Sequence, residues 1–69
     1  MLTTSEITQH RYDPKDCVFF RNALQSTVYM LNGATLLDVI PVATERRLVF
    51  VFSREDHERL KEKWNNHEL

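Results

Sequence analysis

Residues 31–52 read LNGATLLDVIPVATERRLVFVF and contain the pattern that decides the fold. Gly33, the only glycine of the chain, stands where a preceding helix needs a residue with positive φ after its last turn. Two apolar runs follow at 34–42 and 47–52, separated by a turn at 43–46. Successive strands joined by so short a turn pair antiparallel. The stretch therefore predicts a helix that ends at Gly33 and a β-hairpin behind it.

The helix before Gly33 is expected to be amphipathic. Its apolar residues fall on one helical face: Ala23, Leu24, Thr27, Val28 and Leu31, with Met30 at the margin. The opposite face carries Gln25, Ser26, Tyr29 and Asn32. We expect the first face to pack on the sheet and the second, with Tyr29, to face the solvent.

The start of this helix is open to two interpretations. Asn22 and Gln25 resemble a capping box, which would start the helix after Asn22 and leave Cys17–Phe20 as a short strand. Alternatively, Asp16 caps a longer helix that includes these residues. The sequence Cys-Val-Phe-Phe favours the strand, because β-branched and aromatic residues are typical of strands.

A second helix is expected to begin after Ser53. Ser53 is a good N-cap residue, and the acidic residues that follow it lie near the positive end of the helix dipole. Few residues of this helix are candidates for contact with the core: His57, Leu60 and Trp64.

Together these elements predict an α+β domain over residues 17–69, with the order β-α-β-β-α and a small antiparallel sheet. Residues 1–16 are mostly polar and include the turn sequence Asp13-Pro14-Lys15-Asp16, so we expect an N-terminal arm. Within the arm, residues 6–12 could add an edge strand, although their alternation is weak.

Both strands of the predicted hairpin carry apolar residues on both faces, whereas a sheet with one face in water alternates apolar with polar residues. The second helix has too few bulky side chains to cover a whole face. Either the two helices and the arm together cover the sheet, or a second copy of the chain or another protein covers part of it. Four residues are candidate contacts for such a protein partner or homodimer: Phe19, Tyr29, Met30 and Trp64.

The composition limits the classes of function. A formal charge of −1 and a pI near 6.3 provide no global attraction to nucleic acid or to an anionic membrane. The single cysteine rules out an internal disulfide. Together with a polar N-terminus that does not resemble a signal peptide, it indicates a reducing cytoplasm. No apolar run is long enough to span a membrane.

No catalytic or metal site is expected. The histidines are interpreted as solvated surface residues: His10, His57 and His67. The last two are ten residues apart, about 15 Å along a straight helix, and therefore cannot share a metal ion. Cys17, beside an apolar run, is interpreted as a buried thiol and not as a nucleophile. The sequence thus predicts a protein that is not an enzyme and needs no cofactor, metal or small-molecule substrate.

An alternative function is direct binding of nucleic acid. The basic residues that would contact it lie at the hairpin turn and along the last helix: Arg46, Arg47, Arg54, Arg59, Lys61 and Lys63. They are interleaved with acidic residues, so much of the positive field cancels. We therefore expect a mixed, solvated surface and place nucleic-acid binding second to protein binding.

The order of elements also resembles that of a group of small bacterial and phage domains of unknown function. The resemblance covers about residues 18–65 and rests on the helix that ends at Gly33, the run Ala34–Val39, and the strand Phe50–Phe52 that leads into the last helix. It implies no activity and no catalytic residues. It implies a phage or mobile-element origin, where short chains of this kind bind other proteins. The expected function is a small protein-binding module that associates with itself, for example a regulator or inhibitor.

Overall fold

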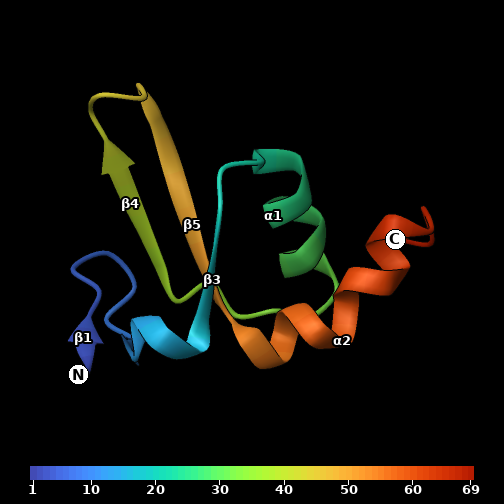
Figure 1. Ribbon diagram of the computed structural model, residues 1–69, viewed down its shortest axis with the longest axis horizontal. Helices are drawn as coiled ribbons and strands as arrows, with labels where there is room; N and C mark the ends of the chain where they lie inside the picture. The colour runs from blue at the N-terminus through green and yellow to red at the C-terminus, as the bar shows by residue number, and fades with distance from the viewer.

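The computed structural model describes residues 1–69 and shows a small α+β fold (Figure 1). The strands are β1 (Thr3–Thr4), β2 (Arg11–Tyr12), β3 (Cys17–Phe20), β4 (Asp38–Val42) and β5 (Arg47–Ser53). The helical segments are the 3-10 turn η1 (Pro14–Asp16) and the helices α1 (Ala23–Leu31) and α2 (Arg54–Asn65). The predicted α+β class and the order β-α-β-β-α from β3 to α2 are confirmed, and a short hairpin precedes them.

β3 resolves the two interpretations of the segment before α1 in favour of the strand. All of its residues pair antiparallel with β5. The side chain of Asn22 accepts a hydrogen bond of 3.1 Å from the N–H of Gln25 and so caps α1, as the sequence indicated. At the other end, Gly33 follows the helix with a φ of +93°, the left-handed conformation expected of it.

The hairpin of β4 and β5 turns at residues 43–46, as predicted, and the three-stranded sheet has the order β3-β5-β4. β4 begins only at Asp38, although the apolar run starts at Ala34. The N–H of Thr35 is bonded to the side chain of Asp56 at 3.0 Å and not to a neighbouring strand. The chain between α1 and β4 therefore follows the start of α2 before it enters the sheet.

Both helices lie on the same face of the three-stranded sheet (Figure 1). The core between them contains Tyr29, Phe52 and Leu60, all nearly inaccessible to solvent. The ring of Phe20 joins this core, with its centroid 5.3 Å from that of Tyr29 and 5.7 Å from that of Phe52. Aromatic pairs at such distances add stability beyond the area they bury. The cluster thereby connects β3, α1 and β5.

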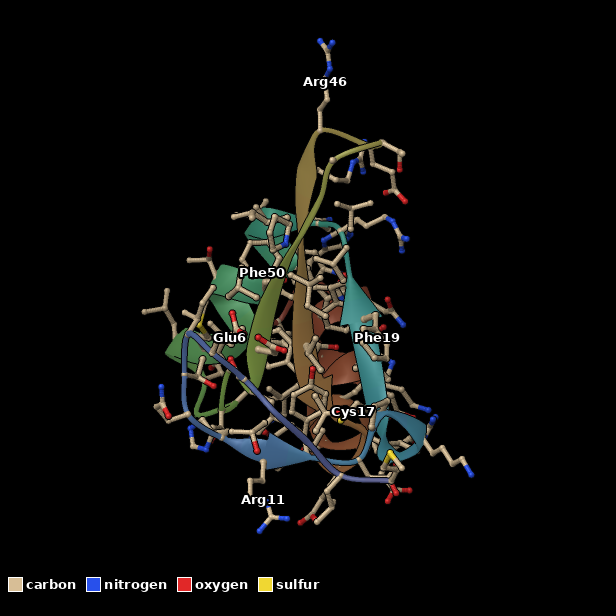
Figure 2. All side chains as sticks on the ribbon, turned by 90° about the vertical axis from the view of Figure 1, so that its left-hand side faces the viewer. Glu6, Arg11, Cys17, Phe19, Arg46 and Phe50 are labelled. Atoms are coloured by element: carbon tan, nitrogen blue, oxygen red, sulfur yellow. The ribbon has the colours of Figure 1, made fainter.

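The N-terminal segment covers part of the opposite face of the sheet. The segment expected as an arm forms an antiparallel hairpin of β1 and β2, and it does not add an edge strand to the larger sheet. In the view of Figure 2 this segment, with Glu6 and Arg11, crosses in front of β4. Tyr12 packs against Cys17 and Val51 in a second small core. Each face of the sheet therefore has a cover, and the N-terminal one is the smaller.

α1 is rotated relative to its predicted orientation. Tyr29 and Ser26, which we expected in solvent, are both 0% exposed, whereas Leu24 and Leu31 are 65% and 80% exposed. The reason is that Tyr29 can fill the aromatic core and still satisfy its hydroxyl, which is hydrogen-bonded to Nδ1 of His57 at 3.0 Å. The prediction that α1 packs through its apolar stripe is therefore wrong.

α2 follows its sequence signals. The hydroxyl of Ser53 accepts a hydrogen bond of 3.0 Å from the N–H of Asp56, so the predicted N-cap is confirmed. Leu60 is buried, and His57 and Trp64 are half-buried on the same side. Neither α1 nor α2 has the length and apolar character that a membrane-spanning helix requires.

Candidate functional site

The outer side of α1 exposes apolar residues to the solvent. Leu24, Thr27 and Leu31 are exposed there and Val28 is half-buried; we call these four residues the outer stripe. α1 contains no charged residue, although a helix that faces water normally carries charged side chains on its exposed face. The outer stripe is therefore an uncharged and largely apolar surface on a regular element.

The inner side of α1 fixes the direction of the outer stripe. The hydroxyl of Tyr29 lies between the side-chain amide of Gln25, which donates to it at 3.4 Å, and Nδ1 of His57 at 3.0 Å. One turn earlier, Ser26 is buried and donates to the carbonyl of Asn22 at 2.9 Å. The bonds of Gln25 and Ser26 lie within the helix, whereas rotating it to bury its leucines would expose Tyr29 and break the bond to His57.

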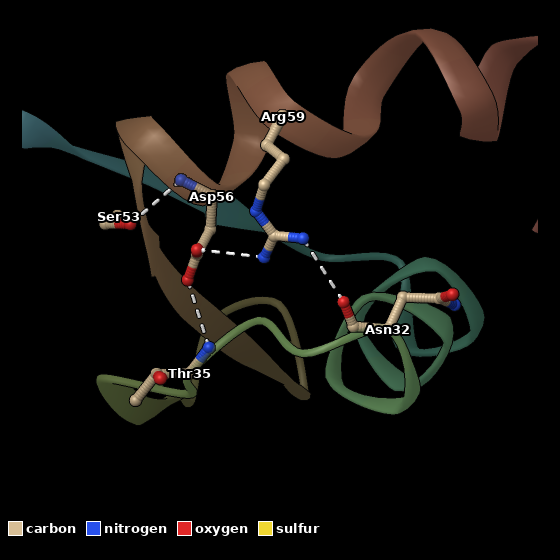
Figure 3. A network of polar contacts seen from close by, with 5 residues as sticks. All are labelled: Asn32, Thr35, Ser53, Asp56 and Arg59. Carbon is tan, nitrogen blue, oxygen red and sulfur yellow. Dashed lines mark hydrogen bonds and ion pairs between the residues drawn. The ribbon is translucent and has the colours of Figure 1, made fainter.

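A network of polar contacts fastens the C-terminal end of α1 to α2 (Figure 3). Arg59 donates to the carbonyl of Asn32 at 3.3 Å and pairs with Asp56 at 3.2 Å. The other carboxylate oxygen of Asp56 accepts from the N–H of Thr35 at 3.0 Å, and the N–H of Asp56 donates to Ser53. The network connects α2 to the chain on both sides of Gly33. The outer stripe is thus held outward by the chain's own contacts.

The structure separates the four residues predicted to contact a protein partner. Tyr29 is inaccessible, so it cannot contact a partner in the folded chain, and this part of the prediction is corrected. Trp64 is half-buried against the same core. Met30 is exposed beside the outer stripe, and Phe19 is exposed on β3. Phe19 lies opposite Val51, on the sheet face away from the helices, so it belongs to a different surface from Met30.

The basic residues of the nucleic-acid alternative do not form one patch. Arg46 and Arg47 lie at the turn of the β4–β5 hairpin, at the far end of the molecule from α2 (Figures 1 and 2). The remaining residues lie on α2: Arg54, Arg59, Lys61 and Lys63. Lys61 pairs with Glu58 at 2.6 Å, and Arg59 belongs to the network of Figure 3. Internal partners therefore offset part of the positive charge on α2.

A buried carboxylate, which the sequence analysis missed, joins the N-terminal hairpin to the sheet. Asp38 is 8% exposed and accepts hydrogen bonds from the hydroxyls of Ser5 at 2.6 Å and Tyr12 at 2.5 Å. It also accepts one from the N–H of Val39 at 2.8 Å. Ser5 is itself buried and accepts from two backbone N–H groups of its own loop. We call Asp38, Ser5 and Tyr12 the clasp.

The protonation states of the clasp match its hydrogen bonds. Burial raises the pKa of Asp38, but the bonds from Ser5, Tyr12 and the N–H of Val39 outweigh it and leave the pKa below its ordinary value. Burial, with the bond to Asp38, raises the pKa of Tyr12 to about 12. At neutral pH the carboxylate is therefore ionised and the phenol protonated. The one sequence signal for this site is a carboxylate alone in the apolar run from Leu36 to Ile40.

Cys17 and His57 are the residues with potential reactivity, and both are engaged in packing. Cys17 is buried as predicted, and burial raises the pKa of its thiol, which disfavours the nucleophilic thiolate. His57 contacts the core, as its position on α2 predicted, and is not the solvated residue of the histidine interpretation: it is half-buried, burial lowers its pKa, and Nδ1 is bonded to Tyr29. No three His, Cys, Asp or Glu side chains lie close enough together to hold a metal ion.

Two open hollows lie along β4. One, of about 380 Å³, lies between the strand and the N-terminal segment and is lined by Thr4, Glu6, Ile7 and residues 38–41. The other, of about 450 Å³, lies at the hairpin turn and includes Arg46 and Arg47. Asp38 is the one buried ionisable group among the lining residues, and its carboxylate is already bonded within the clasp.

The chain matches no known protein-family model, and comparison with curated proteins and with solved structures finds no similar protein. Its function has to be inferred from its own surfaces. Of these, the outer stripe combines exposed leucines with a helix held in place from within, which makes it the leading candidate for a binding site.

The stability of the domain is expected to fall as the pH drops below the ordinary histidine pKa of 6.5. Burial lowers the pKa of His57 in the folded chain. The unfolded chain therefore binds the proton more readily, and the stability is complete only above that pH. Urea unfolding on either side of this pH measures the effect. His57→Asn should remove this dependence of stability on pH, whereas His10→Gln, at an exposed position, should keep it. If the stability of His57→Asn still fell with pH as in the unchanged chain, the assignment to His57 would be contradicted.

Proposed function

We propose that the chain is a small, non-enzymatic protein-binding module that docks on a partner protein through the outer stripe. The observation that carries the proposal is a charge-free helix whose two leucines, Leu24 and Leu31, are 65% and 80% exposed while its tyrosine is buried. Fully burying one leucine side chain is worth about 1.5–3 kcal/mol. Since about 1.4 kcal/mol changes an affinity tenfold, burying both leucines can strengthen binding by about a hundredfold or more.

The chemistry of the outer stripe suits a protein better than a nucleic acid or a lipid surface. Nucleic-acid affinity rests largely on Lys and Arg contacts with phosphates, and helices that lie on membranes carry Lys and Arg beside their apolar face. α1 has neither residue. An apolar groove or helix face of another protein is the surface that an uncharged stripe complements.

Additional features support a binding role over catalysis. The thiol of Cys17 is buried with a raised pKa, and the one half-buried histidine is bonded to a core tyrosine. The accessible surface of the chain is 4906 Å². Because a typical interface takes about 800 Å² from each partner, one interface occupies a substantial part of this surface. We therefore infer a regulator or inhibitor that acts by occupying the partner's surface.

Photo-crosslinking from the outer stripe tests this function. With a photo-reactive residue in place of Leu31, we expect one dominant adduct with a protein other than the chain itself. The same residue in place of Lys63, exposed on α2, is the matched control and should not give that adduct. Equal adducts from both positions, or an adduct between two copies alone, would overturn the assignment.

The identified partner then allows a quantitative test. The double variant Leu24→Glu and Leu31→Lys should weaken binding by about a hundredfold or more, because both leucines lose their apolar contacts. Each new charge has the sign that the nearer helix end favours, so the fold should be kept. A control variant with Glu62→Lys and Lys63→Glu on α2 should bind normally. Unchanged affinity in the Leu24 and Leu31 variant would refute docking through the outer stripe.

A further inference from the structure

The three-stranded sheet ends in two strands, β4 and β3, whose outer edges differ. β4 is closed to an added strand, because Pro41 has no N–H and the N–H of Val39 is bonded to the side chain of Asp38 at 2.8 Å. The N-terminal segment also lies against it, with the hydroxyl of Thr8 donating to the carbonyl of Leu37 at 2.6 Å. Proline, side-chain blocking and a covering loop are devices that protect a sheet edge.

The edge of β3 has none of these protections. Cys17–Phe20 contains no proline and no charged residue, and its register with β5 is unbroken. Figure 2 shows β3 at the margin of the molecule, with no further element beyond Phe19. An unpaired edge of this kind offers a row of N–H and C=O groups to another strand.

The pairing of β5 shows which backbone groups of β3 point outward. The carbonyl of Val51 accepts from the N–H of Leu37 at 2.8 Å, so the backbone groups of Val51 face away from β3. Alternate residues of an antiparallel strand face opposite neighbours, and Phe19 lies opposite Val51. Phe19 therefore directs its N–H and C=O to the open edge. The same alternation directs the C=O of Cys17 and the N–H of Arg21 outward, whereas the N–H of Cys17 is already bonded within η1.

We infer that this edge pairs with β3 of a second copy across a two-fold axis at Phe19, which joins the two three-stranded sheets into one. Each Phe19 N–H donates to the Phe19 C=O of the other copy, and each Arg21 N–H donates to the other copy's Cys17 C=O. A register shifted by two residues toward Cys17 would lose bonds, because the N–H of Cys17 is occupied. The free backbone groups of this edge are therefore self-complementary about Phe19, as an isologous interface requires.

The side chains beside this edge agree with the pairing. Phe19 is 41% exposed, and the axis places it next to its counterpart on the same face of the joined sheet, where the two rings can cover each other. Arg21, which follows β3, is already paired with Glu45 of its own chain at 2.6 Å and therefore brings no unpaired charge to the edge. Two strands this short bury less than the roughly 1,200 Å² of a standard interface, so the dimer is weak.

A dilution series from low micromolar to millimolar concentration tests the inference, with mass and amide hydrogen exchange as readouts. The mass should double with concentration, and exchange at Phe19 and Arg21 should slow in parallel, while exchange at residues of β4 should not change. Phe19→Lys should raise the dissociation constant at least about tenfold, because like charges then face each other across the axis. Phe19→Pro should abolish the dimer and keep the fold, because its N–H does not serve the pairing with β5.

Leu48→Lys is the matched control, because Leu48 is 46% exposed, close to the value for Phe19, and lies on β5. This variant should dimerise normally. A monomer at millimolar concentration, or a dimer that survives both Phe19 variants, would overturn the inference. A monomer whose Phe19 and Arg21 amides become protected only on adding an extended peptide would also overturn it and assign the edge to a foreign strand. Because β3 is not part of the outer stripe, these results are independent of partner binding by α1.

Discussion

Asp38→Ala is expected to lower the free energy of unfolding by about 3–5 kcal/mol and to loosen the N-terminal hairpin from the sheet. The substitution removes the acceptor of the Ser5 bond at 2.6 Å and of the Tyr12 bond at 2.5 Å, and it leaves both buried hydroxyls without that partner. A loss of this size is a large share of the stability of a small domain. Urea unfolding measures the loss, and amide exchange over residues 3–12 measures the loosening.

Tyr12→Phe provides the graded control for this prediction. It removes a single hydrogen bond to an ionised carboxylate and should cost about 1.5–3 kcal/mol. In a double-mutant cycle, Asp38→Ala and Tyr12→Phe should cost less together than the sum of their separate effects, because the residues share a bond. Full additivity, or an Asp38→Ala variant with unchanged exchange in the hairpin, would show that the clasp does not hold this segment.

The clasp and His57 respond to acid in different ranges of pH. Asp38 has a lowered pKa, so its contribution is present above the ordinary aspartate pKa of 3.8 and is lost as the pH falls through the folded value. His57, also with a lowered pKa, loses its contribution in the range below 6.5. The helical side of the domain should therefore weaken in mild acid before the N-terminal hairpin does.

The sequence predicted those features that depend on neighbouring residues. The β4–β5 hairpin, the caps at Asn22 and Ser53, and the left-handed Gly33 all follow from signals within a few positions. Such signals act locally, since a cap or a positive φ is satisfied by its own turn. For Cys17–Phe20 the local signals are compatible with both a strand and a helix, and the antiparallel pairing with β5 makes it a strand.

The clasp could not be predicted because its members are distant in sequence. Asp38 is bonded to Ser5 and Tyr12, which are 33 and 26 residues away. A carboxylate within an apolar strand can be a solvated edge residue or a buried acceptor, and the sequence alone does not distinguish them. The polar composition of residues 1–16 suggested an arm for the same reason. Ser5 is buried because its hydroxyl donates to the distant Asp38, a contact that composition does not reveal.

The face of α1 illustrates a different limit. Counting apolar residues favoured burial of Leu24 and Leu31, but Tyr29 brings more apolar surface and a hydroxyl that finds His57 in the folded chain. Which face packs depends on partners in β3 and α2, not on the helix sequence. Phe19 and Met30 do lie at the surface, as expected of candidate contacts, and their role in binding stays a prediction.

Replacing residues on the two faces of α1 is expected to give opposite results. Tyr29→Ala should cost about 3–5 kcal/mol of unfolding free energy, because it empties the centre of the aromatic cluster, where Tyr29 contacts Phe20 at 5.3 Å between centroids. Leu31→Ala should change stability by less than about 0.5 kcal/mol, since the side chain is 80% exposed. Equilibrium urea unfolding of both variants supplies the comparison.

The pair of variants decides between the two orientations of the helix. If the apolar stripe were the packed face, Leu31→Ala would cost about 2–5 kcal/mol and Tyr29→Ala would be nearly neutral. Tyr29→Phe refines the test, because it keeps the ring and removes only the hydroxyl with its bonds to His57 and Gln25, for a loss of about 1 kcal/mol. If Leu31→Ala leaves the stability unchanged but weakens partner binding, α1 uses one face for the fold and the other for recognition.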